Sequence, residues 1–519
     1  MHDVAIVGFG PSGAVAAGLL GQMGLSVFVC DRQRDVYDKP RAISLDHEVM
    51  RTFQQLGVVH DIEPHVEPFT PSEYFGVDGQ LIRRMTMLAP PHPQGYTPSM
   101  VFNQPAVERV LRARAAALPR VDIALGVELV SLAQDDTGVT LRLRDAQGDL
   151  HTQRARFVIG CDGAASTVRS LLAIELDDLD FDERWLVVDV RVNPRGLAKL
   201  PKTSVQYCEP QRPCTLVIGP GNHRRWEISL HAHEDPQQAA TPEGTWALLS
   251  RWLTPDDGQL WRQASYRFHA LVARQWRVGR AFIAGDAAHQ QPPFLGQGMC
   301  QGLRDVANLA WKLNAVITGE VRGAAAHPLL DSYGVERGGH VRELTSRIKH
   351  VGALIGERDV SQARARDARL LAECGGVVRD TPRQDVLPAL VGGCLSARAT
   401  TARGTLFPQP WLQVDGATPQ RMDAHAGHGW RLVCDDTISH AIPAIHGVKQ
   451  LHIGERGAPE TQGVVAAWMR RHQCHAALLR PDHYVFGVAA TPAELDDLLD
   501  ECGAWLRGSP HPQPETSVR

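Results

Sequence analysis

The stretch VAIVGFGPSG, residues 4–13, decides the fold of this chain. Its first four residues are apolar, glycines stand at Gly8, Gly10 and Gly13, and small residues typical of a tightly packed helix follow to residue 23. A second apolar run, residues 26–30, leads to Asp31. Strand, glycine turn, helix and strand in this order predict a βαβ unit that opens a Rossmann-like α/β domain.

The residue types in this turn suit a bound dinucleotide. Gly8 permits the tight bend, Gly10 lets the backbone approach a pyrophosphate, and Gly13 lets the helix pack closely on the strand. The helix N-terminus offers amide donors to phosphates, and Asp31 would accept a hydrogen bond from a ribose hydroxyl. We therefore favour a ligand site over a purely structural glycine turn, although this motif alone does not separate NAD from FAD.

Composition places the chain among ordinary globular proteins. It has 519 residues, of which 43% are hydrophobic and 22% charged, and its net charge is −4. This length exceeds what one hydrophobic core supports, so we expect two or three domains. The near-neutral balance, without a basic block, argues against nucleic acid or an anionic membrane as the main partner.

Cysteine and histidine usage indicates the compartment and argues against a metal. The ten cysteines are scattered without a CxxC pair, which is typical of free thiols and predicts a cytoplasmic protein. The apolar stretch 4–30 lacks a basic start and is interrupted by glycines, so we interpret it as a buried unit and not as a signal peptide or membrane span. His472, Cys474 and His475 lack a second pair at ligand spacing, and no metal is expected.

Apolar runs and turn residues divide the chain into three domains. Residues 1–180 and 265–385 are expected to form the nucleotide-binding domain with its connecting helices. Between them, short runs rich in β-formers predict a mainly β domain over 181–264, which also receives part of 70–105. Residues 400–506 are expected to form a small α/β domain, and residues 507–519 a disordered tail.

Two further glycine–aspartate turns carry a family resemblance. The segment GCDGAASTVR, residues 160–169, and the segment GDAAH, residues 285–289, each follow an apolar run, and the second continues to Gly298. Together with residues 8–13, their order and distances resemble those of single-component FAD-dependent aromatic hydroxylases, the group A flavoprotein monooxygenases. The resemblance implies a glutathione-reductase-type FAD-binding fold, with FAD as cofactor and NADH or NADPH as co-substrate.

The resemblance also implies contacts with the cofactor. Asp286 would contact the ribityl chain of FAD, and Asp162 and Arg169 would serve both FAD and the nicotinamide. The helix that begins near residue 298 would direct its N-terminal dipole at the flavin and stabilise the negative charge of the reduced ring. The further predicted FAD contacts are Arg32, Arg41, Gln104, Pro293, Gly296, Gly298 and Met299.

Within this family the chain is most similar to 3-(3-hydroxyphenyl)propionate hydroxylases, which insert oxygen ortho to a phenol hydroxyl. The matching segments are residues 21–24, 40–43, 305–313 and 336–337. The last domain resembles the thioredoxin-like appendage of phenol hydroxylases. It lacks a CxxC pair, so we expect a structural or oligomer-forming role, for example in a homodimer.

The chemistry that the resemblance implies needs a base. A reduced flavin would capture O2 as a C4a-hydroperoxide, kept dry beside a phenol that has lost its proton. Asp46 matches the carboxylate that assists phenol deprotonation in phenol hydroxylase, although its position suits a cap of the helix that runs to residue 56 equally well. The neighbouring His47 is the alternative base.

The first interpretation of the substrate is 3-(3-hydroxyphenyl)propanoate or a similar phenol. For the carboxylate of such a substrate, Arg212 and Arg225 are the candidate partners, and Tyr207 is a candidate for the phenol oxygen. Each of the three has an alternative as an ordinary surface or core residue.

Other functions remain open at this stage. The substrate could be another phenol, such as a resorcinol, a nitrophenol or a polycyclic compound. A same-fold FAD reductase is a second alternative, and a flavin-binding scaffold is a third. A flavin halogenase is disfavoured because none of the eleven tryptophans lies in a WxWxI segment.

Overall fold

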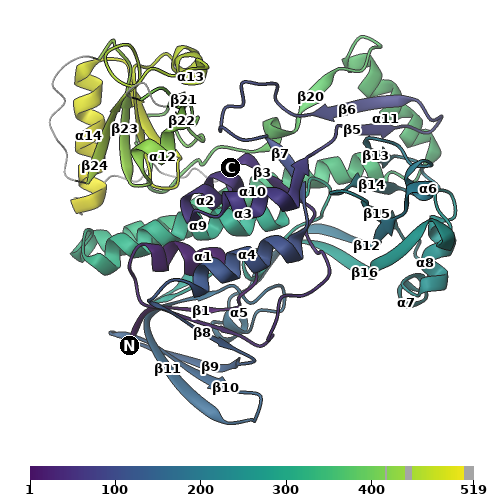
Figure 1. Ribbon diagram of the computed structural model, residues 1–519, viewed down its shortest axis with the longest axis horizontal. Coiled ribbons are helices and arrows are strands. Elements are labelled where there is room, and N and C mark those ends of the chain that lie inside the picture. The colour runs from purple at the N-terminus through teal and green to yellow at the C-terminus, as the bar shows by residue number, and fades with distance from the viewer. Residues whose placement is uncertain (415–417, 439–446, 508–519) are drawn as a thin grey trace.

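The computed structural model describes residues 1–414, 418–438 and 447–507. Figure 1 shows a first domain at the bottom, a sheet-based part at the right, and a small domain at the upper left, coloured yellow. Two long helices, α9 (Gly298–Thr318) and α10 (Ala326–Gly356), run through the centre between these parts. The C-terminal helix α14 (Pro492–Arg507) reaches residue 507, and the rest of the predicted disordered tail lies outside the described residues.

The first domain is built on a largely parallel sheet. Strand β1 pairs in parallel with β2 on one side and with β11 on the other, and β11 pairs in parallel with β18. The central residues of β1 are fully buried, as continuous apolar runs in parallel sheets are. The strands are β1 (His2–Val7), β2 (Val27–Asp31), β8 (Val121–Leu125), β9 (Glu128–Asp135), β10 (Gly138–Arg144), β11 (Leu150–Gly160), β17 (Arg277–Val278) and β18 (Ala281–Ile283). The predicted Rossmann-like unit is confirmed.

Small residues let helices approach this sheet and each other closely. Helix α1 (Pro11–Gln22) packs against α9 and against α4 (Gln104–Ala116). A side chain at Gly18 of α1 would lie 2.8 Å from Leu56, the last residue of α2 (His47–Leu56). The predicted run of small residues therefore serves helix packing. Short strands β3 (Ser44–Asp46), β4 (Val66–Pro68) and β7 (Ser99–Phe102) form a separate small sheet.

A nine-stranded sheet forms the part at the right of Figure 1. Its order is β19-β16-β12-β15-β14-β13-β5-β6-β20. The predicted β domain at 181–264 forms the middle of this sheet, and its two long strands extend beyond these limits into the flanking segments. The strands are β5 (Ser72–Phe75), β6 (Leu81–Thr86), β12 (Leu176–Val192), β13 (Ser204–Tyr207), β14 (Cys214–Ile218), β15 (His223–Ser229), β16 (Gly258–Ala273), β19 (His289–Gln290) and β20 (Asp380–Pro382).

The two faces of this sheet differ in character. On the outer face, alternate residues such as Leu186, Leu216 and Trp226 form an apolar core with helix α8 (Pro242–Leu249). The inner face carries the intervening, more polar residues. We call this inner face, made of the side chains that alternate with the outer core on β12 to β15, the inner sheet face. It is tied to the first domain by residues of β12, β15 and β16.

The C-terminal domain has a four-stranded sheet of order β24-β23-β25-β26. Strands β23 (Trp430–Cys434) and β24 (Val448–His452) are parallel, whereas β25 (Ala476–Leu479) and β26 (Val485–Ala489) are antiparallel to their neighbours. Helices α12 (Met422–Ala426), α13 (Val464–His472) and α14 accompany this sheet. A mixed sheet of this order agrees with the predicted thioredoxin-like domain.

Buried ion pairs hold the C-terminal domain on the central helices. Arg480 pairs with Glu336 of α10 at 2.7 Å, and Lys312 of α9 pairs with the same carboxylate at 2.8 Å. Arg51 of α2 pairs with Asp423 of α12 at 2.8 Å. Removal of one partner from such a pair leaves a buried, uncompensated charge, so these contacts define one docking position.

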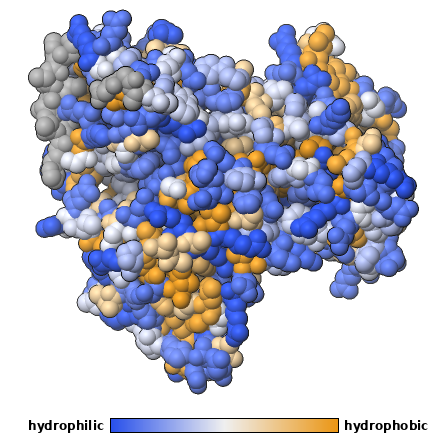
Figure 2. Space-filling model, viewed as in Figure 1, coloured by the Kyte–Doolittle hydropathy of each residue, from blue (hydrophilic) through white to orange (hydrophobic). Residues whose placement is uncertain are grey.

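The surface in this view is mostly hydrophilic, with apolar residues gathered in the middle and lower part over the first domain (Figure 2). Among the described residues, the structure contains no helix with the length and apolar character that a membrane crossing requires. The ten cysteines are all free thiols, and most are buried.

Candidate active site

Three turns meet at the carboxyl ends of β1, β11 and β18. Gly8 has φ +98°, and a side chain there would lie 2.4 Å from the carbonyl oxygen of Cys161 in the second turn. Gly285 of the third turn packs against Ser12 and against Gly302 of α9, since a side chain at Gly285 would lie 2.9 Å from Ser12 Oγ. The close approaches explain why glycine is required, and the three sequence motifs form one site.

The N-terminus of α1 is free to receive a ligand. A side chain at Gly10 would meet no atom within 4 Å, and Gly10 provides no side-chain cap for the helix. A side chain at Gly13 would lie 2.0 Å from the Gly8 carbonyl oxygen, so the helix starts directly against the turn. Asp31 accepts from the Phe9 amide at 2.6 Å and is only partly buried, which leaves its carboxylate beside the turn.

The second turn is held rigid by its own polar residues. Asp162 accepts hydrogen bonds from Ser166 Oγ at 2.5 Å and from the Val168 amide at 3.0 Å. Arg169 donates to the carbonyl oxygen of Ala287 in the third turn at 3.0 Å. These two predicted cofactor residues thus join the second and third turns, and their role at the site is in part to position the backbone.

Asp286 is the acidic residue of the third turn. Its side chain is exposed and makes no hydrogen bond or ion pair with the described residues. The surrounding protein raises the pKa of Asp286 above its usual value, against the opposing effect of His289 and Arg41. Asp305 of α9 fixes the turn by accepting from the Gly285 amide at 2.9 Å. An unpaired carboxylate on a rigid turn suits a ligand with hydroxyl donors.

The predicted flavin-side loop leads into α9. The Gly296 amide donates to the carbonyl oxygen of Pro293 at 2.6 Å, and the Gly296 carbonyl accepts from Ser44 Oγ at 3.1 Å. A side chain at Gly298, the first residue of α9, would meet no atom within 4 Å. Met299 is partly buried, and no side chain caps the helix N-terminus.

The turn at residues 40–42 is fixed by Gln104. The Gln104 side-chain oxygen accepts from the amides of Arg41 and Ala42, at 2.8 and 2.6 Å. The Arg41 side chain is exposed, and Arg32 is exposed as well. Gln104 therefore shapes the turn through its own hydrogen bonds and leaves the Arg41 guanidinium accessible to a ligand.

These features together fit FAD. Two helix N-termini, at Gly10 and Gly298, have uncapped amides and open space beside them. Amides at helix N-termini stabilise anionic groups such as a pyrophosphate or a reduced flavin ring. Asp31 and Asp286 supply acceptors for hydroxyl groups. The residues present therefore offer what a flavin dinucleotide needs along its length.

Asp46 and His47 lie where β3 ends and α2 begins. Asp46 caps α2 by accepting from the Val49 amide at 3.2 Å, and it pairs with Arg304 of α9 at 2.5 Å. Burial on its own would raise the pKa of Asp46, but Arg304 holds it below its usual value, so the carboxylate is charged at neutral pH. Burial lowers the pKa of His47 to about 4, so its imidazole is neutral.

Arg304 connects Asp46 to a longer polar chain. It also pairs with Glu48 at 2.6 Å, and Glu48 accepts from the Tyr484 hydroxyl of the C-terminal domain at 2.8 Å. The chain therefore runs from the C-terminal domain through α2 and α9 to the candidate base. Sequence reasoning found both the capping position and the acidic candidate, but not Arg304, which lies far along the chain.

The structure does not bring the three predicted substrate residues together. Arg225 is buried on the inner sheet face, pairs with Asp189 at 2.7 Å and donates to the carbonyl oxygens of Pro40 and Arg41. Arg212 pairs with Glu234 at 2.6 Å near the protein surface. Tyr207 packs in the core of the outer face, where its hydroxyl accepts from Trp252 Nε1 at 3.0 Å.

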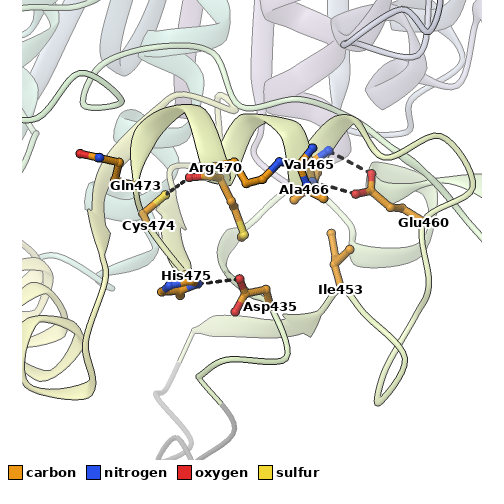
Figure 3. Close-up of a pocket in the computed structure, with 10 residues that line it drawn as sticks. Asp435, Ile453, Glu460, Val465, Ala466, Arg470, Gln473, Cys474 and His475 are labelled. Atoms are coloured by element: carbon orange, nitrogen blue, oxygen red, sulfur yellow. Dashed lines mark hydrogen bonds and ion pairs between the residues drawn. The ribbon is translucent and has the colours of Figure 1, made fainter.

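A separate pocket of about 290 Å³ lies in the C-terminal domain (Figure 3). Glu460 accepts from the amides of Val465 and Ala466 and thus caps the N-terminus of α13. His475 pairs with Asp435 at 2.8 Å. Burial raises the pKa of the Cys474 thiol to about 12, so it has no thiolate character at neutral pH. Glu460, with the helix amides, and His475, with Asp435, are therefore already engaged.

A second cluster, Asp423, His428 and His483, has donor atoms close enough to hold a metal ion. Asp423 is, however, paired with Arg51 and with Arg431, the latter at 2.6 Å. Two guanidinium groups beside the carboxylate oppose a cation there, so this cluster serves to dock the C-terminal domain.

Comparisons with known proteins agree with this site. Residues 1–348 match the family described as "FAD binding domain". A probable NADH-specific resorcinol 4-hydroxylase of Rhodococcus jostii (strain RHA1) is 38% identical, over 99% of this chain and 96% of its own length. A 3-(3-hydroxy-phenyl)propionate/3-hydroxycinnamic acid hydroxylase of Mycobacterium sp. (strain KMS) is 32% identical, over 94% and 88%.

A solved structure has the same fold over nearly the whole chain. The flavin-dependent monooxygenase PieE, solved in complex with FAD and substrate, has a TM-score of 0.79 and 22% identity, covering 97% of this chain and 99% of its own. The family match and the two hydroxylase relatives thus define an FAD-dependent flavoprotein monooxygenase, and the solved structure shows its fold. The chain belongs to the FAD-binding family of aromatic hydroxylases and is an enzyme of that class.

The exposed carboxylate of Asp286 gives a test of the cofactor site. We expect Asp286→Ala to weaken FAD binding about tenfold, because one hydrogen bond to a charged acceptor is lost. FAD titration of the apoprotein, followed by flavin fluorescence, measures the affinity. Asp149→Ala, which removes an exposed carboxylate from a distant turn, is the control. An unchanged FAD affinity in Asp286→Ala would remove Asp286 from the cofactor site.

Proposed function

We propose that this enzyme hydroxylates an uncharged, resorcinol-type phenol at a carbon ortho to a hydroxyl group, with O2 and with NADH or NADPH. The observation that carries this choice of substrate is the placement of the two predicted carboxylate partners. Arg225 is engaged by Asp189 and two backbone carbonyls, and Arg212 by Glu234. Neither guanidinium is free to bind a substrate carboxylate, so a phenylpropanoate substrate would have neither of the two partners predicted for its carboxylate.

The comparisons support the same choice. The resorcinol 4-hydroxylase relative is 38% identical, whereas the phenylpropionate hydroxylase relative is 32% identical. Both names describe hydroxylation of a phenol, so the reaction class does not depend on which substrate is right. A product heavier by one oxygen would identify this class for either compound.

When bound, FAD would supply the chemistry that activates O2. The chain would position the substrate, exclude water from the site and provide a base. In our proposal the Asp46 carboxylate accepts the proton of the reacting phenol hydroxyl, and Arg304 holds that carboxylate in place. Because its pKa is low, the Asp46 carboxylate is ionised near neutral pH and accepts a hydrogen bond from the phenol hydroxyl, whose proton moves to it as the new carbon–oxygen bond forms. His47 stays neutral beside it and presents no second charge.

The proposed substrate is tested with a panel of phenols. We expect resorcinol to stimulate NADH or NADPH oxidation by the FAD-loaded enzyme in air, with a trihydroxybenzene as product by mass. We expect 3-(3-hydroxyphenyl)propanoate to stimulate it at least about tenfold less, because neither Arg212 nor Arg225 is free to pair with its carboxylate. Arg212→Gln is the control and should not change either rate. A higher rate with the carboxylated phenol than with resorcinol would contradict the proposal. A lower rate with the carboxylated phenol in Arg212→Gln than in the parent enzyme would contradict it as well.

The base is tested with Asp46→Asn. This change keeps an oxygen that can cap α2 and removes the charge, while Arg304 keeps Glu48 as its partner. We expect normal FAD content and a rate of hydroxylation about 100-fold lower near neutral pH. The deficit should shrink as the pH approaches about 10, where a phenol ionises unaided.

Product formed per NADH oxidised, followed from neutral to alkaline pH, measures this effect. Asp61→Asn, which changes an exposed carboxylate in α3 (Val59–Ile62), is the matched control. If Asp46→Asn hydroxylates at the parent rate near neutral pH, Asp46 is not the base.

A further inference from the structure

Glu227 is a buried acid on the inner sheet face. It lies on β15 between Trp226 and Ile228, both of which belong to the outer apolar core, so its own side chain has the opposite direction. The β pairing places it opposite Thr215 on β14 and opposite Val187 on β12. Gln206 on β13 pairs with Thr215 and continues the same row. We call Gln206, Thr215, Glu227 and Val187 the inner row.

The inner row lies between two contacts with the FAD-binding domain. On one side, Arg225 reaches the carbonyl oxygens of Pro40 and Arg41, in the turn predicted to touch FAD. On the other side, Trp185 packs edge-on against Phe294 of the flavin-side loop, with ring centroids 5.3 Å apart. A side chain between these two positions is therefore directed toward the FAD-binding domain.

The Glu227 carboxyl has no protein partner. Only 4% of the residue is exposed, yet its carboxyl makes no hydrogen bond or ion pair with the described residues. Other buried acids behave differently: Asp189 is paired with Arg225, and Glu336 with Arg480. A nearly buried carboxyl that has no protein partner needs water or a ligand as its hydrogen-bond partner.

The positive charges near Glu227 are already engaged by other groups. Burial raises the pKa of Glu227 to about 7, with Arg225 and Arg262 opposing this rise and Asp189 adding to it. Both arginines are already used, since Arg225 pairs with Asp189 and Arg262 donates to the Pro40 carbonyl oxygen. The acid is therefore near its midpoint at neutral pH and can either accept or donate a hydrogen bond.

Gln206 offers a second polar group in the same row. Its side-chain oxygen accepts from Thr215 Oγ1 at 2.5 Å, which fixes the orientation of the amide. Its amide nitrogen makes no hydrogen bond with the described residues, so it can donate to a ligand or to water. Thus one acid, Glu227, and one amide donor, Gln206, lie two strands apart on the inner sheet face.

We propose that Glu227, with Gln206 two strands away in the same row, binds the second hydroxyl group of an uncharged dihydroxybenzene; this rests on the proposed function. In this proposal the reacting hydroxyl is held by Asp46, which pairs with Arg304 in the FAD-binding domain. The two hydroxyl groups of a meta-substituted ring are thereby bound from two walls. An acid in this position disfavours a substrate that brings its own carboxylate there.

The proposal is tested by ligand binding to the FAD-loaded enzyme. Resorcinol and phenol are titrated, and the change of flavin absorbance gives each Kd. We expect Glu227→Ala to weaken resorcinol binding about tenfold or more and to leave phenol binding nearly unchanged, because phenol lacks the second hydroxyl group. Glu227→Gln, which keeps the shape, should weaken resorcinol binding less. Glu209→Gln, at a surface pair with Arg251, is the control and should bind both ligands normally.

Thermal unfolding checks that the variants fold and that the acid is unpaired. The pKa of Glu227 is raised from 4.5, the ordinary value for glutamate, to about 7. The burial of this acid therefore lowers the stability of the folded protein as the pH rises from 4.5 through about 7. Glu227→Gln should therefore have a higher Tm than the parent at about pH 8 and a similar Tm at about pH 5. A merely structural glutamate, bonded within the protein, would instead make the variant less stable at both pH values.

Two results would overturn the proposal in different ways. If the parent enzyme and Glu227→Ala bind resorcinol equally well, Glu227 does not recognise the second hydroxyl group. The same conclusion follows if Glu227→Ala weakens phenol binding as much as it weakens resorcinol binding. If the FAD-loaded parent enzyme binds no phenol at all, the proposed function itself fails, and the role of Glu227 fails with it.

Discussion

The buried pair of Asp189 and Arg225 sets the geometry on which the site depends. The Arg225 guanidinium pairs with this carboxylate and donates hydrogen bonds to the carbonyl oxygens of Pro40 and Arg41. Arg262 donates a further hydrogen bond to the Pro40 carbonyl oxygen. The nine-stranded sheet is thus joined to the turn beside the cofactor site by charge-assisted hydrogen bonds. Loss of either partner would leave an uncompensated buried charge, which typically costs about 3–5 kcal/mol.

This constraint has a chemical consequence. An arginine that fixes the distance between two domains is not free to recognise a substrate carboxylate. Two residues further along the same strand, Glu227 lies on the inner sheet face and has no partner among the described residues. In our proposal, the contacts that assemble the domains also favour a neutral phenol as substrate.

The sequence predicts local features well. The βαβ opening, the three glycine turns and Asp46 at the start of α2 depend on short spacings and backbone sterics, which one stretch of sequence displays. It does not reveal which charges pair. Arg304 meets Asp46 across 258 positions, and Arg225 meets the Pro40 carbonyl across 185. Tyr207 and Glu227 look alike as polar residues in β-rich segments, and only the strand register separates the outer core from the inner sheet face.

A crystal structure of the FAD-loaded enzyme with resorcinol tests the central claim most directly. The account predicts the ring between the turn at residues 40–42 and the inner row, with one hydroxyl group within hydrogen-bond distance of the Glu227 carboxyl. The Asp189–Arg225 pair should remain closed in that complex. A ring bound elsewhere, or an Arg225 guanidinium released from Asp189 to contact the ligand, would contradict the account.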